Sequence, residues 1–220
     1  MVMKRIMLVE DHPLLREGLK RLISGQQGLT VCGTAGTVQE ALSLVESEKP
    51  DLVITDLTLP GRNGLELIKD LCASHQGISV MVLSMYDEMI YAERVLRAGG
   101  RGYVMKDAPP ERLIEAIRVV IDGGVFASET VPRHFLKALS NGTTPSQPSF
   151  PLKRLTDREM EVFELIGHAK SNHEIASQLG ISPRTLDAHR AHIRLKLGLS
   201  DGNGLTRHAI RWVEIGMLEK

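Results

Sequence analysis

The chain has 220 residues, of which 42% are hydrophobic and 25% are charged. This composition excludes disordered and fibrous proteins, and the length favours two domains over one. The formal net charge is zero. The residues through Gly124 contain 14 Lys and Arg against 17 Asp and Glu, and those from Val125 onward contain 13 against 10. This small difference is compatible either with chance or with an anionic partner for the second half.

The amino terminus carries no recognisable targeting signal. The stretch MVMKRIMLVEDH becomes acidic too early for a secretory signal peptide, and no apolar run reaches the roughly 18 residues of a membrane span. We therefore expect a cytoplasmic protein. In that reducing compartment Cys32 and Cys72, which both lie in apolar periodic segments, are expected to be buried free thiols.

Short apolar runs alternate with amphipathic helical patterns in the first part of the chain. The runs RIMLV, LTVCGT, DLVITD, ISVMVLS and GYVMK have the length of strands and are nearly all apolar, as in strands that are covered on both faces. Helices are predicted at about 12–24, 37–48, 64–75, 87–98 and 109–122. These units predict a doubly wound, flavodoxin-like α/β domain with five parallel strands over residues 1–124.

A linker and an all-α domain are predicted for the remaining residues. Within residues 125–149, VFASETVPRHFLKALS is compatible with a short helix, and NGTTPSQPS has the composition of an exposed linker. Residues 150–220 show helical periodicity only. TDRE and SNHE have the form of capping boxes, and SPRT places Ser182 as an N-cap ahead of Pro183.

Polar residues follow four of the five predicted strands. They are Glu10, Asp11, Asp56, Ser84 and Lys106. Because ligands of open α/β sheets gather at the carboxyl ends of the strands, these side chains are expected to meet. Three neighbouring carboxylates require a cation, and oxygen ligands in an open cleft suit Mg²⁺. A carboxylate beside Mg²⁺ and a lysine can accept a phosphoryl group, which the lysine and the serine hydroxyl would then contact. One acidic strand end alone would indicate only a solvated side chain, but all five positions together favour a phosphoryl site.

Residues 4 to about 122 resemble the receiver domain of bacterial two-component response regulators. The resemblance is carried by the pair Glu10 and Asp11, by Asp56 in TDLTLPGRNGLEL, by Ser84 in LSMYDE, and by Tyr103 and Lys106 in GYVMKDAPPERL. It implies that a histidine kinase phosphorylates Asp56 and that Ser84 and Tyr103 form the switch. It also implies Mg²⁺ as the cofactor, with the ligands Glu10, Asp11, Asp56 and the backbone carbonyl of Thr58.

Two further positions tend in this family to tune hydrolysis of the phosphoryl group, and here they are Thr58 and Tyr86. We hypothesise that the bulky Tyr86 restricts the attacking water and lengthens the phosphorylated state. The signatures of enzymes are lacking, because VEDHPLL stands where a dinucleotide-binding domain needs G-x-G-x-x-G, and Thr58 stands where an aspartyl-phosphate phosphatase usually has a second acid. We expect no enzyme, only self-phosphorylation from a phosphodonor and slow hydrolysis.

A helix-turn-helix is predicted between Leu155 and Gly198. A short helix with inward-facing Ile175, Ala176 and Leu179 leads through Gly180 to a basic helix, which would normally enter the major groove. The segment also resembles the LuxR-type effector domain of the NarL/FixJ family, through LTxRE, SNxEIAxxLxIS and RTxxxHRxxIxxKL. That resemblance implies a four-helix domain that binds double-stranded promoter DNA through helix 183–197, with the fourth helix in a dimer contact.

On a helical wheel, Leu186, Ile193 and Leu197 share the face that packs on the domain. The opposite face carries Leu195 and its neighbours, with small alanines suited to base edges and cations and hydroxyls suited to phosphates. The residues predicted to meet DNA are Arg184, Thr185, Asp187, Ala188, Ala191, His192, Arg194 and Lys196.

Asp187 departs from the family pattern, which commonly has lysine there and, in some members, another lysine at the position of Ala191. Readout of guanine by those lysines should be absent here. Asp187 either accepts a hydrogen bond from cytosine in the groove, or it pairs with Arg184 or Arg190 and favours the helix amino terminus without touching a base.

In the last helix, Leu205, Ala209 and Val213 recur every four residues, which fits either a dimer contact or the core of the domain itself; Trp212 is expected to pack. The leading hypothesis is a transcription factor that forms a homodimer on phosphorylation. The alternative is an adaptor or phosphoryl sink whose helical domain contacts proteins rather than DNA.

Overall fold

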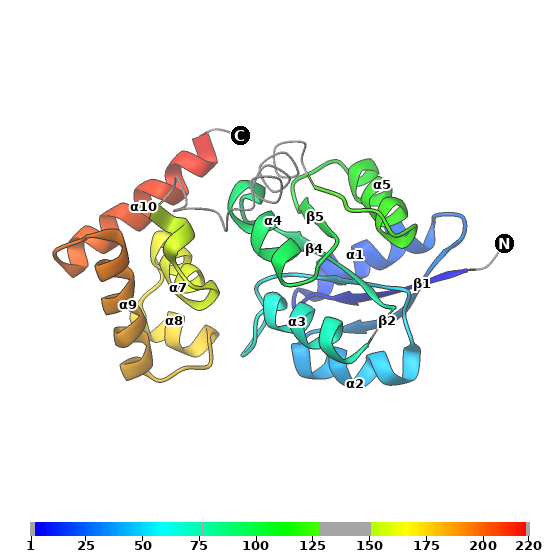
Figure 1. Ribbon diagram of the computed structural model, residues 1–220, viewed down its shortest axis with the longest axis horizontal. Coiled ribbons are helices and arrows are strands. Elements are labelled where there is room, and N and C mark those ends of the chain that lie inside the picture. Colours follow the sequence, from blue (N-terminus) through cyan, green and yellow to red (C-terminus); the bar gives the residue numbers. More distant parts are fainter. Residues whose placement is uncertain (1–2, 76, 128–150, 219–220) are drawn as a thin grey trace, which may run out of the picture. The chain divides into compact units, whose positions relative to one another are not determined.

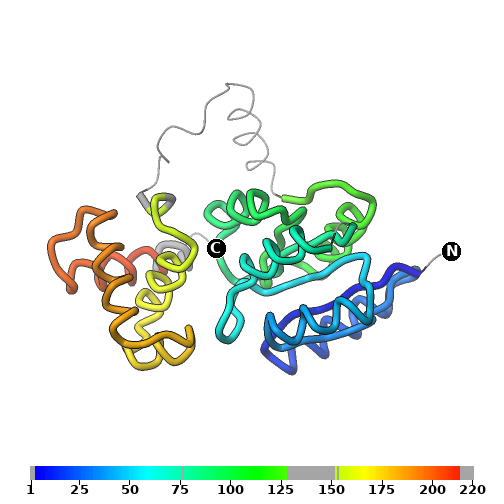
Figure 2. Tube along the Cα trace, turned by 60° about the horizontal axis from the view of Figure 1, so that its bottom comes forward, coloured from blue at the N-terminus to red at the C-terminus, as the bar shows by residue number. Residues whose placement is uncertain are grey.

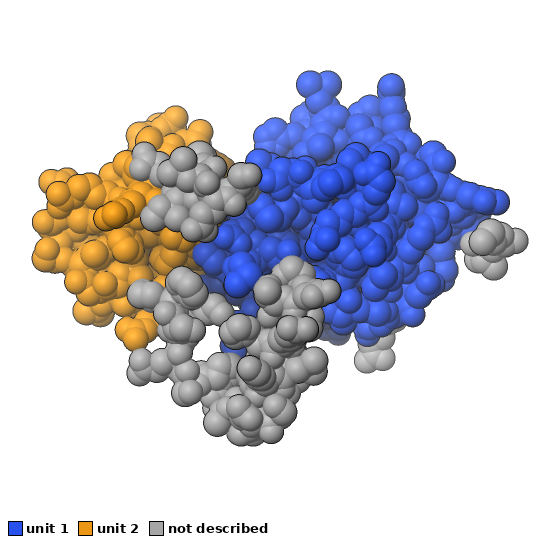
Figure 3. Space-filling model, turned by 90° about the horizontal axis from the view of Figure 1, so that it is seen from above, with its two compact units in different colours: residues 1–137 blue, residues 138–220 orange. Residues whose placement is uncertain are grey.

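The computed structural model describes residues 3–75, 77–127 and 151–218. The chain divides into two compact units, residues 1–137 and 138–220, which Figure 3 shows in blue and orange. The predicted linker at 125–149, with its short helix, lies outside the described residues from residue 128 onward. Each unit is described by itself.

The first unit is built on a sheet of five parallel strands in the order β2-β1-β3-β4-β5. The strands are β1 (Lys4–Val9), β2 (Leu29–Ala35), β3 (Leu52–Thr55), β4 (Ser79–Ser84) and β5 (Gly102–Met105). The helices between and after them are α1 (Pro13–Ser24), α2 (Val38–Glu48), α3 (Gly64–Ser74), α4 (Glu88–Arg97) and α5 (Pro110–Ile121). This is the predicted doubly wound arrangement, and the element bounds agree with the sequence pattern to within about a residue.

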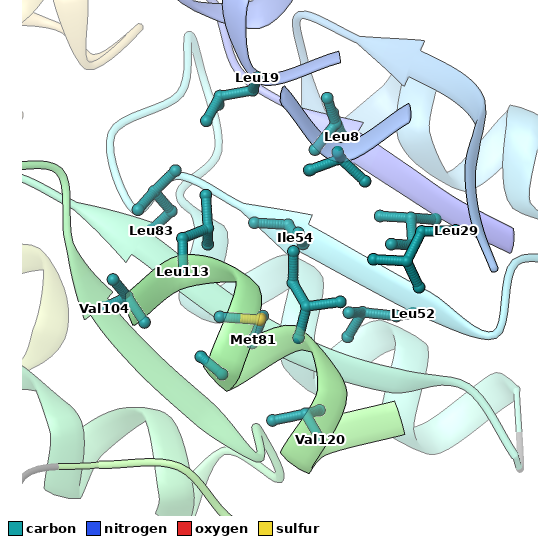
Figure 4. Packing of buried hydrophobic residues seen from close by; sticks show 14 residues of the cluster. Leu8, Leu19, Leu29, Leu52, Ile54, Met81, Leu83, Val104, Leu113 and Val120 are labelled. Carbon is teal, nitrogen blue, oxygen red and sulfur yellow. The ribbon is translucent and has the colours of Figure 1, made fainter. Parts of the chain in front are cut away.

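Helices cover both faces of the sheet, as Figure 1 shows. Side chains alternate between the faces along each strand, so in β1 Ile6 and Leu8 point to one face while Met7 and Val9 point to the other. The first face packs against α1 and α5 in one buried cluster, which Figure 4 shows from close by. Burial on both faces explains why the strand runs are apolar throughout.

The chain after α5 returns to the edge of the sheet. The backbone N–H of Phe126 donates to the carbonyl of Arg101, and the N–H of Tyr103 donates to the carbonyl of Phe126, both at 2.9 Å. The guanidinium of Arg112 lies over the Phe126 ring, 5.3 Å from its centroid. Phe126 is therefore bound to the last strand of the sheet.

The second unit is all-α (Figure 2). Its elements are η1 (Pro151–Arg154), α7 (Asp157–Gly167), α8 (Asn172–Gln178), α9 (Pro183–Leu197) and α10 (Gly202–Leu218). Both predicted capping boxes are present, at Thr156 with Glu159 and at Ser171 with Glu174. The hydroxyl of Ser182 caps α9, as predicted. These caps satisfy N–H groups that a helix leaves unpaired at its start.

Both cysteines are free, but the prediction that they are buried was wrong. Cys32 is partly exposed in β2, and Cys72 is exposed on α3. Cys72 follows the buried Leu71 and is therefore turned by about 100° around the helix, off its apolar face. In the part of the chain that the structure describes, no helix has the length and apolar character needed to span a membrane.

Candidate phosphoryl pocket and nucleic-acid interface

The strand register brings the predicted pocket residues to one end of the sheet. Val9 in β1 pairs with Thr55 in β3, so Glu10 and Asp56 leave neighbouring strands side by side. Ser84 in β4 pairs with Met105 in β5, so the next residue, Lys106, emerges at the same edge. The carboxyl ends of four strands therefore meet around Asp56, as the sequence predicted.

Lys106 joins the two carboxylates that lie deepest in this pocket. Its Nζ atom is 2.8 Å from Oδ2 of Asp56 and 2.7 Å from Oε2 of Glu10. The side chains are almost fully buried, with 8% of Lys106, 7% of Asp56 and 3% of Glu10 exposed. The other oxygen of Asp56, Oδ1, accepts a 2.6 Å hydrogen bond from the N–H of Leu57.

Burial dominates the ionisation of Asp56. It raises the pKa of that carboxyl above its ordinary value, although the charge and hydrogen bond of Lys106 oppose the shift. Burial works to lower the pKa of Lys106, but the charges and bonds of Asp56 and Glu10 outweigh it and the pKa is raised. The lysine is therefore a fixed positive charge, and the carboxylate beside it is only partly compensated.

Asp11 presents an unsatisfied oxygen to the same pocket. Its Oδ1 atom is buried and has no hydrogen-bond partner among the described residues, although it lies 2.8 Å from Nδ1 of His12 as an ion pair. Nδ1 of His12 also lies 3.0 Å from Oε1 of Glu10. The hydrogen bond to Glu10 and the charge of Asp11 raise the pKa of His12. A buried carboxylate oxygen without a donor fits a site for a hard cation.

Hydroxyl groups lie on the side of the pocket opposite the acidic pair. Oγ1 of Thr58 donates to the hydroxyl of Tyr86 at 3.0 Å, and the Tyr86 ring stacks on Tyr91 with centroids 5.1 Å apart. The hydroxyl of Tyr103, a residue that is only 2% exposed, donates to the carbonyl of Tyr86 at 2.8 Å. Ser84 is buried, and its hydroxyl accepts from the N–H of Tyr86 at 3.4 Å. Tyr86 therefore contacts all three of the predicted tuning and switch residues around it.

The helix-turn-helix has the predicted geometry. Ile175, Ala176 and Leu179 are buried, and Gly180 has a φ of +61°, the left-handed conformation that a tight turn between helices needs. In α9, Leu186 and Ile193 are fully buried, whereas Leu197 is only half-buried. The helix therefore lies on its domain along a narrow stripe and exposes the rest.

Most of the predicted DNA-contacting residues are on the exposed face of α9. The exposed ones are Arg184, Thr185, Asp187, Ala188, Ala191 and His192, and the half-exposed ones are Arg194 and Lys196. Lys196 is engaged with its own domain, because its Nζ lies 2.6 Å from Oε2 of Glu159 in α7.

Family models match most of each unit. Residues 6–118 match the response regulator receiver domain, and residues 153–209 match the bacterial regulatory proteins of the luxR family. The chain belongs to the LuxR-type response regulators. These are phosphorylation-controlled, DNA-binding regulators of transcription and not enzymes.

Relatives match this response regulator over most of its length. The oxygen regulatory protein NreC of Staphylococcus carnosus is 33% identical over 210 residues, which cover 94% of this chain and 97% of NreC. A LuxR-family response regulator from Aurantimonas sp. has 33% identity and a TM-score of 0.57 over 63% of this chain and 99% of that one. RcsB of Salmonella typhimurium is alike in fold, with 23% identity and a TM-score of 0.71 over 96% of this chain and 98% of RcsB. RcsB has also been solved bound to promoter DNA with a phosphomimetic.

The open question about the last helix of this response regulator is answered by burial. Leu205 and Ala209 are fully buried and Val213 is 9% exposed, so they belong to the core of the domain. Gly167 of α7 meets them so closely that a Cβ atom there would lie 2.5 Å from Cγ2 of Val213. Trp212 packs as expected, with its ring 5.7 Å from that of Phe163. A dimer contact through α10 would have to use its other residues.

Asp187 makes no ion pair among the described residues of the response regulator. Arg190, one of its two suggested partners, instead donates to Oδ1 of Asn172 at 3.1 Å. Burial lowers the pKa of Arg190, and the charge of Asp187 only opposes that shift. Asp187 also lies just beyond the first turn of α9. Its carboxylate is therefore exposed and open to an external partner.

Sequence reasoning missed one residue of the response regulator that positions the backbone of Asp56. Gly64, the first residue of α3, donates to the carbonyl of Leu57 at 2.9 Å, and a Cβ atom on it would overlap the carbonyl oxygen of Asp56. The start of α3 thus rests directly on the backbone of Asp56. A glycine in the first turn of a predicted helix is the signal that could have indicated this contact.

Proposed function

We propose that Asp56 is the phosphoryl acceptor, that a histidine kinase is the donor, and that phosphorylation controls promoter binding through α9. The observation that carries the proposal is the Asp56 carboxylate, buried at the meeting point of four strands and held by Lys106 beside an acidic pair. An Asp56 oxygen would attack phosphorus as the bond from phosphorus to the kinase histidine breaks, with the electron pair leaving on the histidine nitrogen.

Glu10, Asp11, Asp56 and the backbone carbonyl of Thr58 would hold Mg²⁺. The unsatisfied Oδ1 of Asp11 supports this assignment. Bound there, Mg²⁺ would neutralise charge on the phosphoryl oxygens. Lys106 would contact a further oxygen, and the Ser84 hydroxyl would donate to another in place of its contact with Tyr86. Tyr103 already points inward, which is the orientation expected when Ser84 moves toward the phosphoryl group.

The metal assignment can be tested without phosphorylation. Mg²⁺ should raise the melting temperature of the full chain in proportion to the logarithm of its concentration, because it binds the folded state. Asp11→Asn should abolish most of that shift. Asp122→Asn, an exposed carboxylate at the end of α5, should leave it unchanged. An equal shift in the wild type and Asp11→Asn would contradict the assignment.

In the helical unit, α9 would lie in the major groove of promoter DNA. The exposed Arg184 and the half-exposed Arg194 would meet phosphates or base edges, and dimerisation would place two such helices about 34 Å apart on an inverted repeat. Promoter-bound RcsB supports this placement by analogy of fold. A cytoplasmic location fits both the kinase and the DNA.

The deciding experiment treats the full chain with a small acyl phosphate and Mg²⁺, then measures phosphorylation, oligomeric state and selection of genomic fragments. Wild type and Asp122→Asn should be phosphorylated, dimerise and select specific DNA, whereas Asp56→Asn should do none of these. Phosphorylation of Asp56→Asn would exclude this acceptor. Phosphorylated wild type that selects no DNA would favour the adaptor alternative.

A further inference from the structure

The outward face of α9 carries an apolar stripe. Ala188, Ala191 and Leu195 follow one another at spacings of three and four residues, so they lie on one line along the helix, opposite the buried Ile193. All three are exposed, Leu195 to 81%. Among the described side chains of the helical unit, no other large hydrophobic residue is this exposed. Leu195 therefore contributes little hydrophobic stabilisation to its own domain.

The surroundings of the stripe fit a polyanion. Arg184 begins the same line and Arg194 flanks it, and neither forms an ion pair among the described residues. The one carboxylate of α9, Asp187, lies beside the stripe on the same side of the helix as Arg194. The hydroxyls of Ser182 and Thr185 lie at the amino-terminal end of α9, bonded to each other at 2.8 Å. An apolar line between cations and hydroxyls matches a DNA groove, in which phosphates border the base edges.

The side chains of the stripe determine which bases it can recognise. Recognition of guanine or adenine by two hydrogen bonds needs arginine, lysine, asparagine or glutamine, and none of these stands between Ala188 and Leu195 on this line. What alanine and leucine can contact is the 5-methyl group of thymine, which projects into the major groove. From Ala188 to Leu195 the helix rises about 10 Å, the length of roughly three base-pair steps.

We propose that Ala188, Ala191 and Leu195 read thymine methyl groups, and that Leu195 is the main specificity-determining residue of the three. The proposal rests on the DNA binding proposed for α9 and adds what the helix selects. The half-site then contains thymines where the stripe passes, with the base contacts of Arg184 confined to its other end.

The test removes single methyl groups from DNA. The phosphorylated full chain first selects its site from a random pool, and each thymine of that site is then replaced by deoxyuridine, which differs only by the methyl group. Replacement opposite the stripe should weaken binding by about threefold to fivefold per methyl, the effect of exposing one methyl-sized group. One thymine of each half-site should contact Leu195. In Leu195→Ala, replacement of that thymine by deoxyuridine should no longer weaken binding, because the variant does not contact the methyl group.

Controls separate this proposal from the function on which it rests. Leu14→Ala, which removes a 91% exposed leucine from the other unit, should bind like the wild type. Leu195→Ala is an exposed change to a good helix former, so its circular dichroism should be unchanged. Specific binding that is insensitive to every deoxyuridine, or equally sensitive in Leu195→Ala, would overturn the methyl readout and leave the DNA-binding function intact.

Two other results would also overturn it. A change in oligomeric state of Leu195→Ala without DNA would assign the stripe to a contact between copies of the chain. Absence of any DNA selection by the phosphorylated wild type would remove the proposed function itself.

Discussion

Burial opposes ionisation of the Asp56 carboxyl. Its pKa is raised in the folded protein above the ordinary value of 3.8. A group of this kind stabilises the fold fully only below about pH 4, where it is protonated in both states, and the stabilisation is lost as pH rises through the folded pKa. The buried Asp56 carboxylate, our proposed acceptor, is therefore expected to lower the stability of the receiver as pH rises.

We predict that Asp56→Asn raises the melting temperature of the receiver unit at pH 7 and that the gain disappears below about pH 4. The chain offers a selective probe, since Tyr86, Tyr91 and Tyr103 are its three tyrosines and all lie in this unit. Their near-ultraviolet circular dichroism should be followed without Mg²⁺. Asp122→Asn serves as the exposed control, and an Asp56→Asn protein that melts lower at pH 7 would contradict the prediction.

The Thr58–Tyr86 hydroxyl pair gives the hydrolysis hypothesis a physical form. The bond fixes the Tyr86 ring, which also stacks on Tyr91, beside the acceptor. Tyr86→Ala should therefore accelerate loss of phosphate from the purified phosphorylated chain. Tyr86→Phe and Thr58→Val, which remove one hydrogen bond but keep the bulk, should accelerate it by about fivefold or less, as expected for one net hydrogen bond. An unchanged or slower rate in Tyr86→Ala would refute the hypothesis.

At the scale of elements, α3 positions the acceptor through Gly64. Gly64→Ala should shift the Asp56 backbone, lower the stability of the receiver by about 1–3 kcal/mol and reduce phosphorylation by a small acyl phosphate, although no pocket side chain changes. Gly18→Ala in α1 is the matched control. No atom would meet its new Cβ within 4 Å, so we expect unchanged phosphorylation and a gain of up to about 1 kcal/mol. Equal phosphorylation of both variants would show that α3 does not set the acceptor geometry.

Two cations of α9, Arg194 and Lys196, have different roles, because among the described residues only Lys196 forms an ion pair with α7. Burial works to raise the pKa of Glu159, but hydrogen bonds from Lys196 and Thr156 outweigh it and the pKa is lowered. Lys196 thus anchors the helix, whereas Arg194 remains available to phosphate. Arg194→Gln should reduce the slope of log Kd against log salt by about one, and Lys196→Gln should reduce it less. Only Lys196→Gln should lower the melting temperature reported by Trp212 fluorescence, and equal slopes would contradict this division.

The elements and the pocket could be predicted because each depends on local pattern. Apolar runs fixed the strands, and polar strand ends identified Glu10, Asp56 and Lys106. Contacts between side chains distant in sequence left no such pattern. The bond from Thr58 to Tyr86 and the anchor from Lys196 to Glu159 depend on how the elements pack. The prediction for Cys72 failed for a different reason, because a shift of one residue around α3 separates its buried side from its exposed side.

At the scale of the whole molecule, any coupling between the phosphoryl site and DNA binding must change both affinities by the same factor. If a phosphoryl group on Asp56 strengthens promoter binding by some factor, the promoter strengthens occupancy of the phosphoryl site by the same factor. Beryllium trifluoride, the phosphomimetic of the RcsB complex, makes this measurable as a binding equilibrium. Its affinity for the chain should rise on addition of the selected DNA by the factor by which it tightens that DNA. No change with DNA would show that the units are uncoupled.

The pairing of Phe126 with β5 connects the end of the receiver to the residues beside the pocket. The N–H that binds the Phe126 carbonyl belongs to Tyr103, whose hydroxyl reaches the Tyr86 carbonyl beside the pocket. Tyr103 therefore binds Tyr86 through its side chain and Phe126 through its backbone. If phosphorylation moves the backbone of Tyr103, we therefore expect Phe126 to move with it, because the two residues share a backbone hydrogen bond.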